Sequence, residues 1–236
     1  MGARWKERIK RSLDNQYERD DFVRSELRKL PDHSLILDAG AGSQRYRNDC
    51  RHLDYRAQDL GEYTRDQKQQ LGDHGADQRS DYEFGPLDYT GNIWQINERN
   101  DTFDAILCTE VLEHVPYPID TVRELARLLK PGGTLILTAP SNCLRHFDPI
   151  FFTSGFSDRW FEKVLPEVGL EVALIDPVGD YYRWVAVELA RTMKTHPLST
   201  PALFSAFLYY RSKRPTKASV DTLCMGYHVV AQKPVD

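Results

Sequence analysis

The stretch LILDAGAG, residues 35–42, decides the fold of this chain. Three aliphatic residues lead into an acid and two glycines, which is the pattern of a buried strand that ends in a tight turn. Glycine accepts a positive φ and lets a ligand approach the main chain closely. Amides exposed at such a turn, just before a helix, can hold an anionic group. The stretch therefore predicts a nucleotide-like ligand at the carboxyl end of the first strand of an open α/β sheet.

Length and composition restrict the class of protein. The chain has 236 residues, of which 41% are hydrophobic, so it can bury a substantial core in one large domain. A net charge of -4 does not point to nucleic acid or an anionic membrane as a partner. The four cysteines are widely spaced without a CxxC motif, which favours free thiols in a reducing compartment. Residues 1–10 lack an apolar signal core, and no apolar run approaches the roughly 20 residues that span a bilayer. We therefore expect a cytoplasmic protein.

Predicted strands and helices alternate after the first stretch, which indicates a doubly wound α/β sheet. The last strand is expected to be antiparallel. Expected strands cover 34–38, 53–59, a short piece at 87–88, 103–108, 134–139, 170–175 and 222–232, and expected helices cover 43–49, 118–130, 158–168 and 181–193.

Four further segments have less certain roles. Residues 3–29 have apolar side chains at helical spacing, so they predict an amphipathic helical extension that packs on the domain edge or covers a pocket. Residues 60–86 form a long polar loop of the kind that is often functional or mobile. The apolar patch 203–210 predicts either a helix buried against the sheet or a dimer contact or pocket wall. The basic run 211–217 favours a solvated loop.

The residues after the glycine turn narrow the ligand. A dinucleotide site requires GxGxxG, but Arg45 occupies the place of the third glycine, which allows close helix–strand packing. Asp59 lies at the end of the second expected strand, where an acid can bind both hydroxyls of a ribose. The pattern therefore still predicts a ligand that contains a ribose, but it argues against a dinucleotide-dependent dehydrogenase.

Three motifs in order resemble one family. Residues 35–42 with Asp59, FDAILCTEVLEHV at 103–115 and RLLKPGGTL at 127–135 are similar to class I S-adenosylmethionine (SAM)-dependent methyltransferases. The resemblance implies a Rossmann-like seven-stranded sheet with the last strand antiparallel. The apolar patterns add an N-terminal helical extension and extra helices before the last strand. We expect a single domain over 1–236. Its parts would be an extension or lid at 1–30, a SAM-binding core at 34–176, and C-terminal helices with the last strand at 177–236.

The resemblance further implies that SAM is the methyl donor and that residues at strand ends contact it. The glycine turn would hold the methionine part, with the preceding acid supporting the turn or the ammonium group. The acid after strand two would bind the ribose, and an acid after strand three would meet the adenine amino group, although turn capping is an equal alternative there. Main-chain atoms after strand four would meet the ammonium group. The turn residues are Gly40 and Gly42, and the acid that precedes them is Asp38. The ribose acid is Asp59, and the adenine acid is Asp88, with the amide of Tyr89 beside it. The main-chain atoms after strand four belong to Cys108 and Thr109.

Two histidines are the candidate catalytic residues. A hydroxyl acceptor needs a base or a metal, and imidazole titrates near neutral pH. His146 lies in the loop after the fifth expected strand, which overhangs the ligand crevice of such a sheet, so it is the preferred base. His114 is the second candidate, for which a structural role is favoured.

A metal site is a secondary interpretation. The residues Glu110, Glu113 and His114, with His146 added, resemble the ExxEH metal cluster of small-RNA 2′-O-methyltransferases. Two carboxylates and two imidazoles can bind a divalent metal. Because metal-free relatives carry the same short pattern, metal-free transfer is preferred.

The sequence therefore predicts SAM-dependent methyl transfer to a small-molecule acceptor, with O-methylation of a sugar or related metabolite hydroxyl as the leading hypothesis. N-methylation of an amine is one alternative. A non-catalytic SAM-binding regulator or partner subunit is another. The partner is expected to be a small-molecule substrate, with no nucleic acid and no membrane, and the protein a monomer or homodimer.

Overall fold

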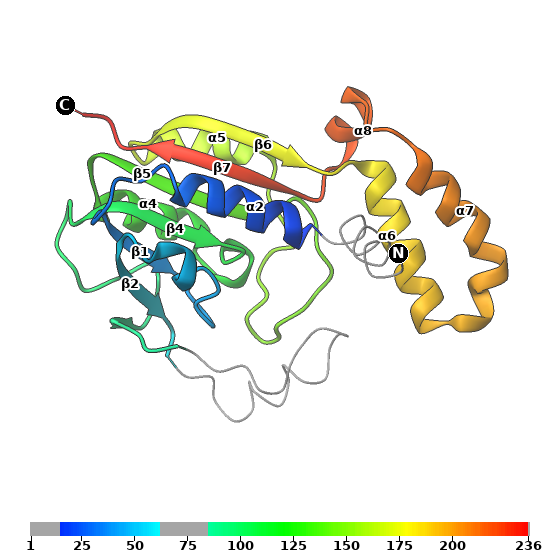
Figure 1. The fold of residues 1–236 in the computed structure, drawn as a ribbon, viewed down its shortest axis with the longest axis horizontal. Coiled ribbons are helices and arrows are strands. Elements are labelled where there is room, and N and C mark those ends of the chain that lie inside the picture. Colours follow the sequence, from blue (N-terminus) through cyan, green and yellow to red (C-terminus); the bar gives the residue numbers. More distant parts are fainter. Residues whose placement is uncertain (1–14, 62–84, 236) are drawn as a thin grey trace.

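A computed structural model describes residues 15–61 and 85–235. Its centre is a seven-stranded sheet of order β3-β2-β1-β4-β5-β7-β6 (Figure 1). The pairs among β1 to β5 are parallel, whereas β7 runs antiparallel to both β5 and β6, which confirms the predicted sheet and its antiparallel last strand. The strands are β1 Leu35–Ala39, β2 Asp54–Asp59, β3 Tyr89–Thr90, β4 Phe103–Thr109, β5 Leu129–Pro140, β6 Glu171–Val178 and β7 Gly226–Gln232.

Helices cover both faces of the sheet (Figure 1). One hydrophobic cluster joins α4 and α5 to the central strands, and a second joins α2 and η1 to the opposite face. The central strands β1 and β4 and the second half of β5, residues 135–140, are largely apolar because both of their faces are buried. The helices are α2 Gln16–Leu27, η1 Arg47–Cys50, η2 Leu112–His114, α4 Pro118–Leu128, α5 Asp158–Glu167, α6 Tyr181–Thr195, η3 Pro197–Ser199, α7 Thr200–Ser212 and α8 Lys217–Thr222.

Several element boundaries differ from the sequence prediction. The helix expected to reach Lys130 ends at Leu128, because Leu129 already pairs with Phe103 as the first residue of β5. The following glycines continue the sheet: Gly132 N–H donates to Lys233 O at 2.8 Å. The helix expected at 43–49 is a turn followed by the single turn of η1.

The C-terminal helices depart further from expectation. The patch 203–210 does form a helix, α7, but its burial against the sheet is wrong: α7 packs on α6, and none of its residues is buried in the described part of the chain. The two helices extend past the end of the sheet (Figure 1). The basic run 211–217 is exposed, as predicted. No helix within 15–61 and 85–235 has the length and apolar character needed to cross a bilayer. Most of the expected 60–86 loop, residues 62–84, lies outside the described residues.

Candidate functional site

The glycine turn after β1 is held by the end of β2. Gly40 has φ +75° and Gly42 has φ +51°, a region that strongly favours glycine. A Cβ added at Gly40 would lie 2.4 Å from Val111 Cγ2, so no larger residue fits without movement of the Val111 side chain. Gly42 N–H donates to Asp59 Oδ2 at 2.7 Å. The strand register thus places the acid of β2 directly against the turn of β1.

Asp59 is oriented by main-chain donors. Its Oδ1 accepts the Leu60 N–H at 2.7 Å, while its Oδ2 accepts the Gly42 N–H. Burial raises the pKa of this carboxyl, and the two amide hydrogen bonds partly offset that rise. Asp59 lines a cavity of about 310 Å³ that also includes Gly40 and residues 91–94. This cavity is within the size range of small-molecule sites.

Asp38 lies beneath the same turn and is only 3% exposed. Burial raises the pKa of its carboxyl to about 7, against the hydrogen bond that Tyr55 OH donates to Oδ2 at 2.6 Å; the nearby Asp59 charge raises it further. Together with the turn and Thr109, Asp38 lines a small polar cavity. An ammonium group placed there would favour the ionised form of Asp38.

Arg19 of α2 is a candidate site residue that the sequence did not single out. Its Nη1 lies 2.7 Å from Glu110 Oε2, its side chain is 15% exposed, and it lines the small cavity together with Asp38. The guanidinium is therefore beside the turn, where a carboxylate ligand could pair with it. The sequence marks residues 16–27 as an amphipathic helix, but which of its charged side chains faces the turn depends on how the helix packs.

Arg45, which stands in place of the third dinucleotide glycine, has a partner on α2. Its Nε and Nη2 donate to the two carboxylate oxygens of Asp20 at 2.9 and 2.6 Å. Asp20 is 6% exposed and also accepts the Tyr46 OH at 2.9 Å. The Arg45–Asp20 pair connects α2 to the segment that follows the glycine turn. Arg45 therefore contributes to helix packing, whereas a glycine at this position would allow a close helix–strand contact.

Asp88 and Tyr89 do not lie where the sequence placed them. β3 is Tyr89–Thr90, so Asp88 precedes the strand, and its expected position after strand three is wrong. Its Oδ2 accepts the Ala57 N–H at 2.9 Å, which joins the end of the preceding loop to β2. Both residues line a neighbouring cavity that shares Gln58, Gly91 and Asn92 with the first. The segment that follows β3 and lines the first cavity is 91–94.

A second cavity of about 370 Å³ adjoins the first. Glu110, His114 and Phe147 line both, so these residues form the shared wall. The rest of the second cavity comes from the 142–147 loop and from α6, with Arg19 at its edge. The two cavities therefore lie on either side of the His114 wall.

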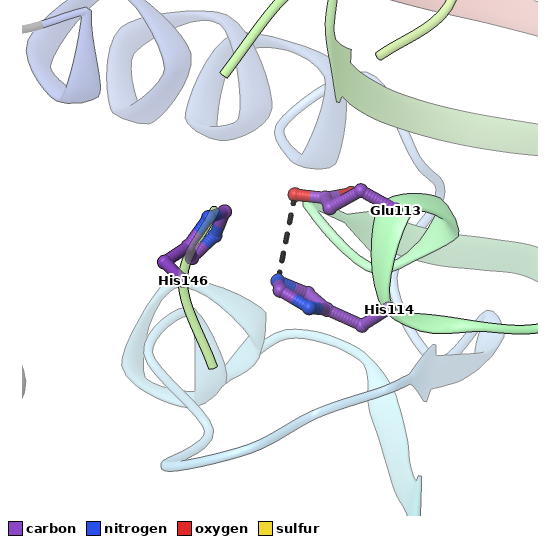
Figure 2. Close-up of side chains that lie close together, drawn as sticks. All are labelled: Glu113, His114 and His146. Carbon is purple, nitrogen blue, oxygen red and sulfur yellow. Dashed lines mark ion pairs between the residues drawn. The ribbon is translucent and has the colours of Figure 1, made fainter. Parts of the chain in front are cut away.

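His114 and His146 are neighbours at this wall, with ring centroids 4.8 Å apart and planes at 85° (Figure 2). His114 Nδ1 lies 2.7 Å from Ile150 O, and His146 Nδ1 lies 2.8 Å from Leu144 O. A carbonyl oxygen only accepts, so each Nδ1 carries the proton and each neutral ring keeps its lone pair on Nε2. Burial lowers the pKa of His114 to about 4, which keeps that ring neutral near pH 7.

A family model described as a methyltransferase domain matches residues 11–196, which is most of the chain. The chain belongs to this methyltransferase family. The membership confirms the resemblance to class I SAM-dependent methyltransferases and, with it, SAM as the family cofactor.

Individual relatives cover less or resemble the chain more distantly. A ubiquinone biosynthesis O-methyltransferase of Xanthomonas campestris pv. campestris (strain B100) is 56% identical over 70 residues, which are 30% of this chain and 28% of that protein. The aligned part thus spans under a third of that curated relative. Geranyl diphosphate methyltransferase in complex with SAM has 15% identity and a TM-score of 0.53, over 92% of this chain and 84% of that one. The [4+2]-cyclase SpnF has 19% identity and a TM-score of 0.52, over 91% and 80%. At such identities the structures establish the fold alone, and the cyclase is named for a different reaction.

In this methyltransferase, the residues predicted to bind the cofactor lie in two groups. The first, formed by Asp38, Gly40, Gly42, Asp59 and Thr109, lines the connected cavities around the glycine turn. The second lies away from them: Cys108 is fully buried in β4, and the two residues at β3 face the neighbouring cavity. A role for Cys108 could therefore involve its main chain but not its thiol, as the sequence had suggested.

Three of the four predicted metal ligands gather in one cluster. Glu113, His114 and His146 offer ligand atoms that all lie within 4.8 Å of one another (Figure 2). Glu110 is engaged elsewhere, since its carboxylate accepts the Thr138 hydroxyl at 2.9 Å and pairs with Arg19.

The chemistry of this cluster fits a divalent metal ion. Glu113 is 1% exposed, its Oε1 lies 3.7 Å from His114 Nε2, and its buried Oε2 has no hydrogen-bond partner among the described residues. Burial, followed by the Glu110 charge, raises the pKa of Glu113 well above its usual value. Two Nε2 lone pairs and one carboxylate are a donor set suited to a transition metal, and each ring's Nδ1–H bond to a carbonyl is the outer contact that typically orients such a ligand.

Proposed function

We propose that this protein transfers the methyl group of SAM to a hydroxyl of a small metabolite, such as a sugar or a related compound. The observation that carries the proposal is the position of His114 on the wall shared by the two cavities, beside His146. The first cavity has the acid and the glycine turn suited to SAM. The second has room for an acceptor and is lined by both imidazoles.

The cofactor contacts follow from the first cavity and its polar extension. Asp59 would accept both ribose hydroxyls, the glycine turn would hold the methionine part, and Asp38 would face the ammonium group. Arg19 would pair with the methionine carboxylate in place of Glu110. Residues 91–94 would border the adenine, with Asp88 behind them.

The acceptor hydroxyl needs a proton acceptor. As its oxygen bonds to the methyl carbon, the carbon–sulfur bond breaks, S-adenosylhomocysteine leaves, and the hydroxyl proton moves to a base. We assign that base to His146 Nε2, because burial makes His114 a weak proton acceptor with a pKa of about 4. His114 would border the hydroxyl at the shared wall, and the two cavities would align oxygen, methyl and sulfur.

Two observations favour O-methylation over the alternatives. The curated relative that matches part of the chain is named an O-methyltransferase. The paired imidazoles would be superfluous for an amine, which reacts once it is unprotonated. A non-catalytic SAM-binding protein would have no use for a second cavity of about 370 Å³ beside the first.

The decisive experiment measures release of S-adenosylhomocysteine from SAM with one panel of sugar and other metabolite hydroxyls and one panel of amines. We expect turnover with hydroxyl acceptors and a methyl ether in the product by mass spectrometry and NMR. Turnover with amines only would replace the proposal by N-methylation. SAM binding without turnover on either panel would favour the regulator.

A divalent metal at Glu113, His114 and His146 is a second candidate, favoured by the unpartnered Glu113 oxygen. When bound, such an ion would acidify the acceptor hydroxyl. The test is metal content after purification without chelator, followed by activity after EDTA treatment and after return of Mg²⁺, Mn²⁺ or Zn²⁺. Stoichiometric metal and a loss reversed by one ion would support it. Full activity of metal-free protein would exclude it and leave His146 as the base.

A further inference from the structure

The hairpin of α6 and α7 has an apolar outer face that no described element covers. Along α7, Phe204, Leu208 and Tyr209 are 49%, 46% and 56% exposed. Phe204 and Leu208 are four residues apart and therefore neighbours on the helix surface, and Tyr209 borders them. Leu198, in the turn between the helices, is 99% exposed. In Figure 1 this hairpin extends from the end of the sheet, so its outer face is accessible to a large flat partner.

The charge of the hairpin differs from that of the whole chain. Between Glu188 and Asp221 the sequence has six Lys or Arg residues and no Asp or Glu, whereas the net charge of the chain is -4. Two of the six cations pair with the bounding acids, Arg191 with Glu188 at 3.2 Å and Lys217 with Asp221. The cations flank the apolar face: Arg191 and Lys194 lie near one end of the hairpin, and the exposed run 211–217 follows α7 at the other. Lys213 Nζ lies 4.2 Å from the centre of the Tyr209 ring, so a cation and an aromatic side chain meet at the edge of the face.

We propose that the α6–α7 hairpin docks on an anionic lipid bilayer, with the apolar face of α7 in the headgroup region and the cations against lipid phosphates. An apolar helix face flanked by Lys and Arg is what binds at a bilayer surface without crossing it, and clustered cations attract anionic lipids. A second copy of the chain is the weaker occupant, since pairing two of these faces would bring the cations of one copy against those of the other.

Docking would place the lipid surface beside the second cavity. Trp184, Val187 and Arg191 of α6 line that cavity, so the docked hairpin is also part of its wall. The inference goes beyond the proposed activity and does not depend on it, because lipid binding is measured without turnover. It also qualifies the sequence expectation of no membrane partner, which rested on net charge and on the absence of a spanning segment.

The test is sedimentation of the full-length protein with vesicles of phosphatidylcholine, with and without phosphatidylglycerol, at low and high salt. We expect binding to phosphatidylglycerol vesicles at least about 10-fold tighter than to the neutral ones, and a loss at high salt. The double variant Phe204→Gln/Leu208→Gln should weaken binding by about 10-fold or more. Replacing Arg211, Lys213 and Arg214 by Ser should weaken it by roughly 100-fold.

The matched control is Leu174→Gln on β6, where a leucine is 40% exposed away from α7. It should bind vesicles as the wild type does, and thermal unfolding midpoints should show that every variant is folded. Equal binding to both vesicle types, or full binding by the double variant, would overturn the proposal. So would a protein that ignores vesicles but whose dimer, in analytical ultracentrifugation, dissociates on Phe204→Gln/Leu208→Gln, because the face would then belong to a second copy.

Discussion

The proposed cofactor side and the proposed acceptor side of the site share the His114 wall, but different parts of the chain build them. The cofactor side is made by the ends of β1, β2 and β4, whose register brings Asp59 to 2.7 Å from the Gly42 amide. The acceptor side combines η2, the 142–147 loop and α6, which are far apart in sequence and meet only through tertiary packing. Main-chain geometry determines the first, and side-chain contacts between loops and helices determine the second. Substitutions on the two sides should therefore change different measured quantities.

The largest effect is expected on the acceptor side, for His146→Ala. Loss of the proposed base should lower kcat by about 10²- to 10⁴-fold. The Kd for S-adenosylhomocysteine, measured by calorimetry, should stay within about twofold, because His146 lines the second cavity and not the first.

The control for that variant is His33→Asn. His33 has φ +63°, a region that Asn tolerates better than most residues, and its side chain is 87% exposed. Its kcat should equal that of the wild type. An unchanged kcat for His146→Ala would remove His146 as the base, whereas a weakened cofactor Kd would show that the two sides are not separable.

The next largest effect lies on the cofactor side, for Asp59→Ala. The variant removes the proposed acceptor for two ribose hydroxyls and the partner of the Gly42 amide. Hydrogen bonds to a charged group contribute about 1.5–3 kcal/mol each, so loss of two should raise the Kd for S-adenosylhomocysteine by about 10²-fold or more. At saturating SAM the kcat should fall far less than in His146→Ala. A cofactor Kd unchanged in calorimetry would place the ribose elsewhere.

The sequence predicts which residues gather at the glycine turn better than which residues form the second cavity, for the same physical reason. Asp38, Gly40, Gly42 and Asp59 are each adjacent to a strong strand signal, and strand ends of a parallel sheet meet at one edge. Arg19 escaped prediction because its position depends on the docking of α2, which no local pattern encodes.

Where local signals are weak, prediction failed even on the cofactor side. β3 is only two residues long and follows a long polar segment, so its position was misjudged and Asp88 was placed on the wrong side of it. On the acceptor side, the closeness of His114 and His146 could be suggested from the two loops that carry them. The separation of Glu110 from that cluster could not, because it follows from the pairing of Glu110 with Arg19 and Thr138.

A smaller effect on the cofactor side should appear as a dependence of stability on pH. The native pKa of Asp38, about 7, exceeds the value near 4 expected for an unfolded chain, so between these pH values only the native state holds the proton. This contribution to the free energy of unfolding is complete below about pH 4 and is lost as pH rises through 7, with a magnitude on the order of 4 kcal/mol. Urea unfolding of the cofactor-free protein at several pH values should show the fall.

The matched variant for this prediction is Asp38→Asn, whose amide oxygen can still accept the Tyr55 hydroxyl. Its urea series should be flatter than that of the wild type over the same pH range. An equal slope in both proteins would assign the fall to other groups and would mean that Asp38 is ionised in the cofactor-free protein.

The smallest effect is expected for substitutions of Arg45, which follows the glycine turn. They test whether the Arg45 side chain stabilises the packing of α2 or binds the cofactor. Arg45→Gly restores the dinucleotide pattern but leaves the nearly buried Asp20 without its two guanidinium hydrogen bonds. Because the Arg45 side chain is half exposed, we expect a loss of only about 1–2 kcal/mol in the free energy of unfolding. Arg45→Lys, which keeps the charge without the two-pronged contact, should lose about half as much. The Kd for S-adenosylhomocysteine should change far less than in Asp59→Ala. If Arg45→Gly weakened cofactor binding as strongly as Asp59→Ala at unchanged stability, Arg45 would be a cofactor ligand, and the main chain would not be enough to account for that side of the site.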